Sequence, residues 1–369
     1  MGVVMRVARF GRGGWARAAI AVTVAALDLV GATAVSASAR TSDRQHEGTC
    51  AQPVTSGLHV VDVVQQGVHR PLQLWVPSGY ADRAVPLMFW LHGSGTTGAQ
   101  AMATVDSAGQ PLFPADADEH GYAVATPTGA VPFNPAPGFS GFAWNIPGVP
   151  LVGSTVYPPP GTLDDVAYIG LAIDAIAATM CIDQRRVYAS GASGGGRMAS
   201  QLACDLADRI TAVAPVMGVR FPRASDTPGR SVDCVPSRPV PVLAIHGRLD
   251  PVNVFADDDP RIVPGSSWTY GAPEALHRWA DSNGCNPNNV RREPVAVHVD
   301  LVTYRGCHSG ADVALYDVAD GGHTVPGTLA VPFLVPIVGP TNQELNTPDA
   351  IWDFVSHFRL PNTHDGHLD

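Results

Sequence analysis

The sequence predicts a single α/β domain built on a mostly parallel β-sheet that is flanked by helices. Short apolar runs alternate along the chain with segments of helical periodicity, which is typical of this architecture. Several runs are apolar at consecutive positions, as strands buried on both faces require. A length of 369 residues, 45% of them hydrophobic, suits one large domain better than two.

The predicted elements follow one another in alternating order. Eight apolar runs indicate strands: residues 59–64, 72–77, 85–93, 122–129, 185–193, 210–218, 240–247 and 313–318. Apolar residues at helical spacing predict helices at residues 164–180, 195–209 and 349–358. Neither an internal repeat nor a Ser/Thr-rich linker divides the chain, so we expect no tethered binding module.

Two stretches do not fit this alternation. Residues 130–161 and 324–341 are rich in Pro, Gly and apolar residues but have no period. Because a long ordered loop in a compact domain is usually functional, we expect both to frame the functional site. The alternative is that they only cover an edge of the sheet.

The N-terminus predicts export. Four Arg lie within the first 17 residues, an apolar stretch follows at residues 18–39, and residues 37–39 (Ala-Ser-Ala) match a signal-peptidase site. A retained membrane anchor is the alternative, but Asp28 interrupts the apolar run. We therefore expect a secreted protein with no membrane span once the signal peptide is removed. The predicted parts are a signal peptide (1–39), a flexible segment (40–49), the domain (50–360) and a flexible tail (361–369).

Charge and motifs exclude several classes of partner. The chain has 33 acidic residues against 23 basic ones, all Arg, for a formal net charge of −10. Such a chain repels phosphate backbones, so we expect no nucleic-acid partner. Neither a Cys-x-x-Cys nor a His-Glu-x-x-His pattern indicates zinc.

Six cysteines lie beyond the predicted cleavage point, and an even number in an exported chain indicates disulfides. They are Cys50, Cys181, Cys204, Cys234, Cys285 and Cys307. Proximity in the chain suggests that Cys204 pairs with Cys234. The pairing of Cys50 and Cys181 stays open. The alternative is that Cys181 and Cys204 are buried thiols.

A nucleophile motif stands between a predicted strand and a predicted helix. Residues 191–195 (Gly-Ala-Ser-Gly-Gly) fit the pattern G-x-S-x-G, in which a sharp strand-to-helix turn exposes the serine hydroxyl. Small neighbours make that turn sterically accessible, and the start of the helix favours developing negative charge. Ser193 is the predicted nucleophile.

A serine nucleophile needs a base, and the base needs an orienting acid. Asp250 follows the predicted strand 240–247, and His323 follows the strand 313–318, so both lie where parallel strands deliver functional loops. We interpret His246 as a packed structural residue. The competing candidates are interpreted as surface or strand residues: Asp257, Asp258, Asp259, Asp312, Asp317, His277 and His308.

The loop after residues 85–91 predicts the oxyanion hole. His92, Gly93, Ser94 and Gly95 follow that strand directly. We assign the backbone N–H groups of Ser94 and Gly194 to the hole. His92 is then a structural residue of the loop.

Five motifs together carry a family resemblance. They are LHGSGTTG (91–98), VYASGASGGGRMASQLACDLADRITAVAPV (187–216), PVPVLAIHGRLDPV (239–252), WADSNGC (279–285) and DGGHTVPG (320–327). The chain resembles the secreted polyhydroxybutyrate-depolymerase-like and feruloyl-esterase-like serine esterases over roughly residues 50–360. The resemblance implies an α/β-hydrolase fold, hydrolysis through an acyl-enzyme, no metal or organic cofactor, and Ser193, Asp250 and His323 as the triad.

The resemblance also implies a disulfide between Cys285 and Cys307. Members of the family often carry Trp two residues after the histidine, where this chain has Val325. Depolymerases that act on polymer granules tend to carry a linker and a binding domain, and neither is recognisable in this sequence.

The two irregular stretches supply candidate walls for a substrate cleft. We assign substrate contact to Trp144, Phe142 and Val325. Other aromatic and aliphatic side chains of the same stretches are candidates as well: Phe133, Phe139, Tyr157, Leu329, Phe333, Leu334 and Ile337. The alternative for each is ordinary core beneath a loop.

The leading hypothesis is a secreted carboxylic-ester hydrolase whose substrate is a hydroxyalkanoate, feruloyl or acetyl ester, either a small molecule or a polymer. An envelope acyltransferase with the same triad is the first alternative. A catalytically silent binding protein is the second.

Overall fold

The computed structural model describes residues 34–35, 54–81, 83–134, 140–146, 150–151, 156–223, 226, 233–262 and 269–361. Apart from residues 34–35, the predicted signal peptide and the segment 40–49 lie outside these residues. So do residues 362–369 of the predicted tail. The division of the chain into these parts therefore stays a prediction.

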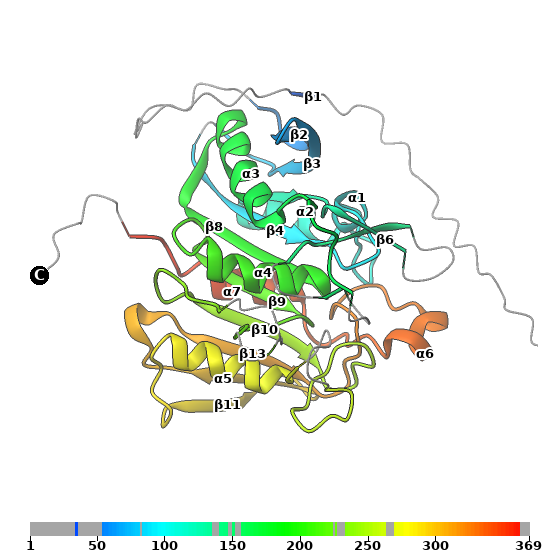
Figure 1. Ribbon diagram of the computed structural model, residues 1–369, viewed down its shortest axis with the longest axis vertical. Helices are drawn as coiled ribbons and strands as arrows, with labels where there is room; N and C mark the ends of the chain where they lie inside the picture. Colours follow the sequence, from blue (N-terminus) through cyan, green and yellow to red (C-terminus); the bar gives the residue numbers. More distant parts are fainter. Residues whose placement is uncertain are drawn as a thin grey trace, which may run out of the picture.

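One large sheet runs through the molecule (Figure 1). Its order is β1-β2-β3-β5-β4-β8-β9-β10-β13-β12-β11. The strands are β1 (Ala34–Val35), β2 (Gly57–Gln65), β3 (Val68–Val76), β4 (Val85–Leu91), β5 (Ala123–Thr126), β8 (Ile182–Ala192), β9 (Ala212–Val216), β10 (Val242–Gly247), β11 (Val290–Pro294), β12 (Val299–Tyr304) and β13 (Val313–Val318). The six from β5 to β13 in this order are parallel. Antiparallel pairs extend both ends, and the outermost pair β1–β2 is parallel.

Helices cover both faces of the sheet. The helices α3 (Asp165–Thr179), α4 (Gly194–Asp205) and α5 (Ala272–Ser282) pack in one apolar cluster. On the other face lie α1 (Gly98–Met102), α2 (Leu112–His120) and α7 (Thr347–Val355). Figure 1 shows α3, α4 and α5 in front of the sheet and α7 behind it. The central strands are buried on both sides, which explains their unbroken apolar sequences.

The predicted fold class is confirmed. Each of the eight predicted strands corresponds to a strand of the sheet, and the three predicted helices correspond to α3, α4 and α7. The Asp164 side chain caps α3 by accepting from the N–H groups of Val166 and Ala167. α2 ends at Gly121, whose φ of 73° is left-handed.

The two irregular stretches leave the sheet at the same edge as the loops after β8, β10 and β13. The first contains the small hairpin of β6 (Val131–Phe133) and β7 (Gly141–Ala143). The second contains the 3₁₀ turn η3 (Pro332–Leu334) and the short helix α6 (Val335–Val338). No helix in the described part of the chain is both long and apolar enough to cross a bilayer.

Candidate active site

The turn between β8 and α4 holds Ser193 in an unusual backbone conformation, with φ 55° and ψ −114°. Its N–H donates to Val216 O at 2.9 Å. The neighbouring glycines are needed because the turn is tightly packed. A Cβ on Gly191 would lie 2.7 Å from the Cβ of Leu91, and a Cβ on Gly196 would lie 2.9 Å from Val216 O.

Three side chains from three loops form one hydrogen-bonded chain. His323 Nε2 lies 2.9 Å from Ser193 Oγ, and His323 Nδ1 lies 2.8 Å from Asp250 Oδ2. The second oxygen of Asp250 accepts from the backbone N–H groups of Val252 and Asn253, each at 2.7 Å. The structure therefore brings together the three residues that the sequence singled out, in the order that nucleophilic catalysis needs.

The carboxylate of Asp250 is buried beneath the histidine and has a second imidazole beside it. His246 Nε2, also buried, lies 3.4 Å from Asp250 Oδ2. Burial by itself would raise the pKa of Asp250, but the hydrogen bonds from His246 and His323 outweigh it and hold that pKa well below its usual range. Asp250 thus stays ionised, and His246 occupies the packed position that the sequence interpretation gave it.

The loop that carries His323 is fastened to the second irregular stretch. The N–H of His323 donates to Val338 O at 2.5 Å, and the N–H of Gly322 donates to Pro340 O at 2.7 Å. A Cβ on Gly322 would lie 2.6 Å from Gly339 Cα. The imidazole is therefore positioned by the last residue of α6 and by the residues that follow it.

Ser94 and Gly194 approach one another closely, as an oxyanion hole requires. A Cβ on Gly194 would lie 3.2 Å from Ser94 N. Within the described residues, neither N–H donates to a protein acceptor. Gly194 is also the first residue of α4, whose N-terminus favours negative charge.

The buried His92 side chain stabilises this loop through hydrogen bonds. His92 Nδ1 lies 2.8 Å from Gly93 O, and its Nε2 accepts from the N–H of Gly129 at 3.0 Å. Burial lowers the pKa of His92 to about 4, against the opposing hydrogen bond to Gly93. His92 is therefore a neutral structural residue, as its place in the sequence suggested.

The structure corrects the role expected of Trp144. Its side chain is only 3% exposed, its indole N–H donates to His92 O at 2.8 Å, and its ring packs 4.7 Å from the His92 ring. Trp144 is therefore core beneath the oxyanion loop, and it does not face a cleft. The sequence could not separate these roles, because both need an aromatic residue in a Gly-rich and Pro-rich loop.

Phe142 and Val325 keep part of their surface exposed. The carbonyl of Phe142 accepts from the N–H of Gly95 at 2.9 Å, so Phe142 lies beside the oxyanion loop. Val325 packs against the apolar cluster on the face of the sheet that α1, α2 and α7 cover. Phe139 lies outside the described residues. Leu329, Phe333 and Ile337 are largely exposed.

A buried carboxylate that the sequence analysis missed ties down the first irregular stretch. Asp165 accepts from the N–H groups of Ala130 (3.1 Å) and Asn145 (2.6 Å) and from Arg70 (2.6 Å). Arg70 also donates to Thr128 O at 2.8 Å. The hairpin β6–β7 is thus anchored at both ends to the start of α3.

The competing acid and base candidates lie elsewhere. Asp317 is bound by Arg248 at 2.6 Å, and Asp257 accepts from the N–H of Gly271 at 3.0 Å. His277 and His308 are exposed. None of these residues takes part in the hydrogen-bonded chain of Ser193.

The structure joins Cys204 to Cys234 and Cys285 to Cys307, the two pairs that the sequence analysis suggested. Cys181 is also disulfide-bonded. Cys50 lies outside the described residues. Cys204 is thus a bridged residue and not a buried thiol.

The sheet, the strand-to-helix turn at Ser193 and the loop order define an α/β-hydrolase fold. Acetyl xylan esterase from Aspergillus awamori matches 82% of this chain with a TM-score of 0.51, over 99% of its own length. At 13% sequence identity, this likeness concerns the fold alone.

Sequence comparison adds more specific relatives. Feruloyl esterase B of Piromyces equi is 30% identical over 291 residues, which cover 77% of this chain and 44% of that protein. Feruloyl esterase D of Neurospora crassa is 27% identical over 197 residues (53% and 56%). The bifunctional acetylxylan esterase/xylanase XynS20E of Neocallimastix patriciarum is 25% identical over 296 residues (80% and 34%). No protein-family model matches the chain.

The resemblance to feruloyl-esterase-like serine esterases is thereby confirmed. The chain spans about half, or less, of the length of these curated relatives.

Proposed function

We propose that this protein is an exported serine carboxylic-ester hydrolase. The single observation that carries the proposal is the chain of contacts from Ser193 Oγ through His323 to Asp250, at 2.9 and 2.8 Å. A serine hydroxyl in that arrangement has a base for its proton, and the base has an ionised partner. The disulfides and the predicted signal peptide support export.

The reaction begins when Ser193 Oγ attacks the ester carbonyl carbon and its proton moves to His323 Nε2. The N–H groups of Ser94 and Gly194 bind the resulting oxyanion. When the tetrahedral intermediate collapses, the alcohol leaves with the proton from His323, and the acyl group remains esterified to Ser193. Water then loses a proton to His323 and releases the acid. Because imidazolium cannot accept a proton, the rate falls in acid.

Asp250 holds the imidazole and stabilises its charged form during both steps. Its lowered pKa keeps the carboxylate ionised while His323 carries the proton. The contact with His246 also helps to lower the pKa of Asp250. The acid in this site is therefore never a proton donor.

We further propose that the acyl group is apolar and of the feruloyl type. The partly exposed Phe142 borders the oxyanion loop, and the names of the curated relatives include feruloyl esterases. Hydroxyalkanoate and acetyl esters are the competing substrates. A turnover panel of methyl ferulate, acetylated xylan, hydroxybutyrate oligomers and p-nitrophenyl acetate ranks them, and the proposal requires methyl ferulate to have the highest kcat/KM.

The mechanism is tested by labelling the protein with a serine-directed phosphonate and measuring hydrolysis. We expect the label on Ser193, and we expect Ser193→Ala to lower kcat by roughly 10⁴-fold to 10⁶-fold. Ser107→Ala, at an exposed serine, is the matched control and keeps both properties. Full activity in Ser193→Ala would refute the assignment.

The same assay separates the alternatives. A silent binding protein takes no label and hydrolyses none of the esters. An acyltransferase turns over only when an acceptor alcohol is supplied, whereas the proposed hydrolase needs water alone.

A further inference from the structure

A second cluster of polar side chains lies away from Ser193, where α2 meets α7. Asp116 and His120 stand one turn apart on α2, and Asp349 lies in the first turn of α7. His120 Nε2 lies 3.6 Å from Asp116 Oδ2 and 3.7 Å from Asp349 Oδ1. One ligand atom from each of the three residues lies within 4.8 Å of the other two.

Each carboxylate in this cluster has one oxygen already bound by the protein. Tyr122 donates to Asp116 Oδ1 at 2.5 Å, and Asn346 donates to Asp349 Oδ2 at 2.5 Å. The remaining oxygens, Asp116 Oδ2 and Asp349 Oδ1, are the ones that lie toward His120. The hydrogen bonds thus orient both carboxylates with a free oxygen toward one point.

Asp116 is the unusual member, because its residue is only 6% exposed. Its Oδ2 is buried and has no hydrogen-bond partner among the described residues. A buried carboxylate oxygen without a donor is costly unless a cation or a proton satisfies it.

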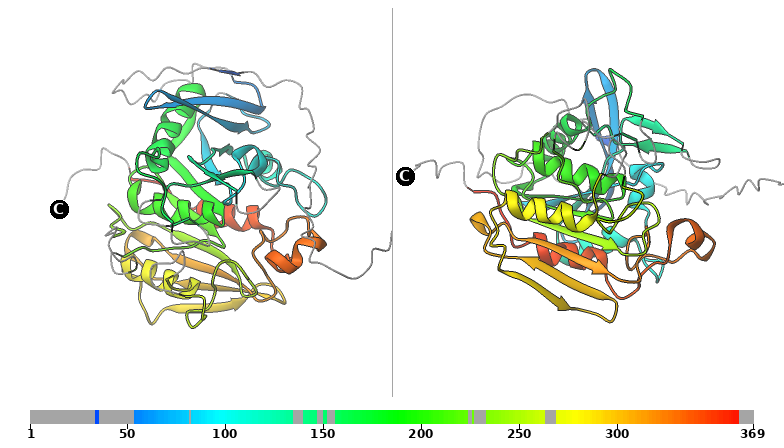
Figure 2. Two further views of the ribbon diagram at one scale, coloured as in Figure 1. Left: turned by 45° about the vertical axis from the view of Figure 1, so that its right-hand side comes forward. Right: turned by 60° about the horizontal axis from the view of Figure 1, so that its bottom comes forward.

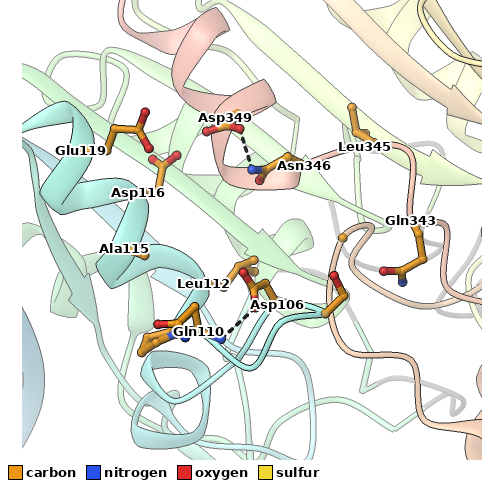
Figure 3. A pocket seen from close by; sticks show the side chains of 13 residues that line it. Asp106, Gln110, Leu112, Ala115, Asp116, Glu119, Gln343, Leu345, Asn346 and Asp349 are labelled. Carbon is orange, nitrogen blue, oxygen red and sulfur yellow. Dashed lines mark hydrogen bonds between the residues drawn. The ribbon is translucent and has the colours of Figure 1, made fainter.

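The spacing matches the coordination sphere of a small divalent metal. Two ligand atoms that each lie about 2.0 Å from a tetrahedral Zn²⁺ are roughly 3.3 Å apart. His120 Nε2 lies at nearly this separation, 3.6 and 3.7 Å, from the two carboxylate oxygens. A cavity of about 350 Å³ adjoins the cluster and is lined by Asp116, Glu119 and Asp349. Figure 3 shows these three carboxylates on the same side of that cavity, two from α2 and one from α7. The cavity leaves room for water or Glu119 as a fourth ligand.

We propose that Asp116, His120 and Asp349 form a binding site for a divalent transition-metal ion such as Zn²⁺. One imidazole and two carboxylates suit Zn²⁺ better than Ca²⁺, which prefers six to eight oxygen ligands. The metal joins α2 to α7, two helices that are far apart in the sequence. Its role is to stabilise the fold, because none of its ligands contributes to the hydrogen-bonded chain of Ser193.

The test is a titration of the chelator-treated full chain with Zn²⁺, followed by calorimetry and by thermal unfolding. We expect saturable binding and a rise in Tm of about 5 °C when free Zn²⁺ is 100 times the Kd. His120→Gln and Asp349→Asn each remove one ligand from a partly exposed position, and both are expected to lose one bound Zn²⁺ per chain and the rise in Tm. Asp353→Asn, at an exposed position on α7, is the matched control and keeps the bound Zn²⁺ and the rise in Tm.

The readout is the change that Zn²⁺ produces in each protein, so a lower starting Tm of a variant does not affect it. Substitution with Co²⁺ adds a spectroscopic measure: absorption bands from nitrogen and oxygen ligation are expected in the parent chain and in Asp353→Asn, and not in His120→Gln. Equal Zn²⁺ stoichiometry and an equal rise in Tm in the parent and in His120→Gln would overturn the site. So would a parent chain whose Tm does not respond to Zn²⁺.

Discussion

The two irregular stretches beside Ser193 have similar compositions but opposite surroundings. In the first, Trp144 and Ile146 are buried, and Asp165 binds the backbone at both ends of the β6–β7 hairpin. In the second, Phe333 is 56% and Ile337 is 62% exposed. Figure 2 shows the segment around α6 projecting from the body of the molecule. Composition therefore does not reveal whether an apolar loop forms core or surface.

The difference lies in what each stretch is bonded to. The first supports the oxyanion loop through the Trp144 side chain, which donates to His92 O, and through the backbone of Phe142. The second supports the His323 loop through backbone hydrogen bonds to Val338 and Pro340. Its apolar side chains Phe333 and Ile337 are exposed. Both stretches therefore support the site, but only the second presents exposed apolar side chains beside it.

The largest effect is expected from the first stretch. Trp144→Ala removes a buried ring, and we expect the free energy of unfolding to fall by about 3–5 kcal/mol. Trp144→Phe keeps a ring but leaves His92 O without its donor, so its loss is smaller. Urea denaturation measures both. A change below about 1 kcal/mol for Trp144→Ala would show that this stretch is no more part of the core than the second.

A pH effect of intermediate size comes from His92. Unfolded imidazole takes up a proton near pH 6.5 and folded His92 only near pH 4, so the unfolded state binds more protons in this window. The free energy of unfolding therefore falls as the pH falls from 6.5 to 4, and His92 contributes about 3 kcal/mol of that fall.

His92→Gln keeps an acceptor for the N–H of Gly129 but cannot titrate. Denaturation of both proteins at pH 7 and pH 4.5 is expected to show a weaker pH dependence in the variant. Identical pH dependence would mean that the pKa of His92 is the same in the folded and the unfolded protein, so that burial does not lower it.

The smallest effect on stability is expected in the second stretch. Phe333→Ser and Ile337→Ser change exposed side chains, so the free energy of unfolding should stay within about 0.5 kcal/mol. If these side chains contact an apolar acyl group, each substitution costs about 1 kcal/mol of substrate-binding free energy. That loss raises KM roughly fivefold while kcat is retained.

Val297→Ser is the control, at a residue that is 86% exposed in the turn between β11 and β12. The contact with substrate is refuted if the KM of Phe333→Ser and Ile337→Ser equals that of this control.

Much of the fold could be predicted because the sheet is buried on both faces. Strands such as β4 and β10 are apolar at nearly every position, and this pattern is visible in the sequence alone. The short helices α1 and α2 and the exposed strand β11 lack it. Their formation depends on contacts that the sequence does not display.

The site likewise contains residues that the sequence predicts and contacts that it does not. Ser193, Asp250 and His323 could be found because each follows a recognisable strand, and the order of strands fixes where loops meet. The supporting contacts could not be predicted, because Asp165 and Arg70 are brought together only by the folded chain. The cluster of Asp116, His120 and Asp349 was missed for that reason too.

At position 193 the residue that would give the most stable fold differs from the residue that the proposed reaction needs. A non-glycine residue at φ 55° and ψ −114° costs of order 1–3 kcal/mol, which glycine would largely avoid. Selection of variants for thermal tolerance alone would therefore favour the loss of this hydroxyl. Engineering of this scaffold has to screen for turnover and heat resistance together, or it will enrich well-folded proteins that no longer react.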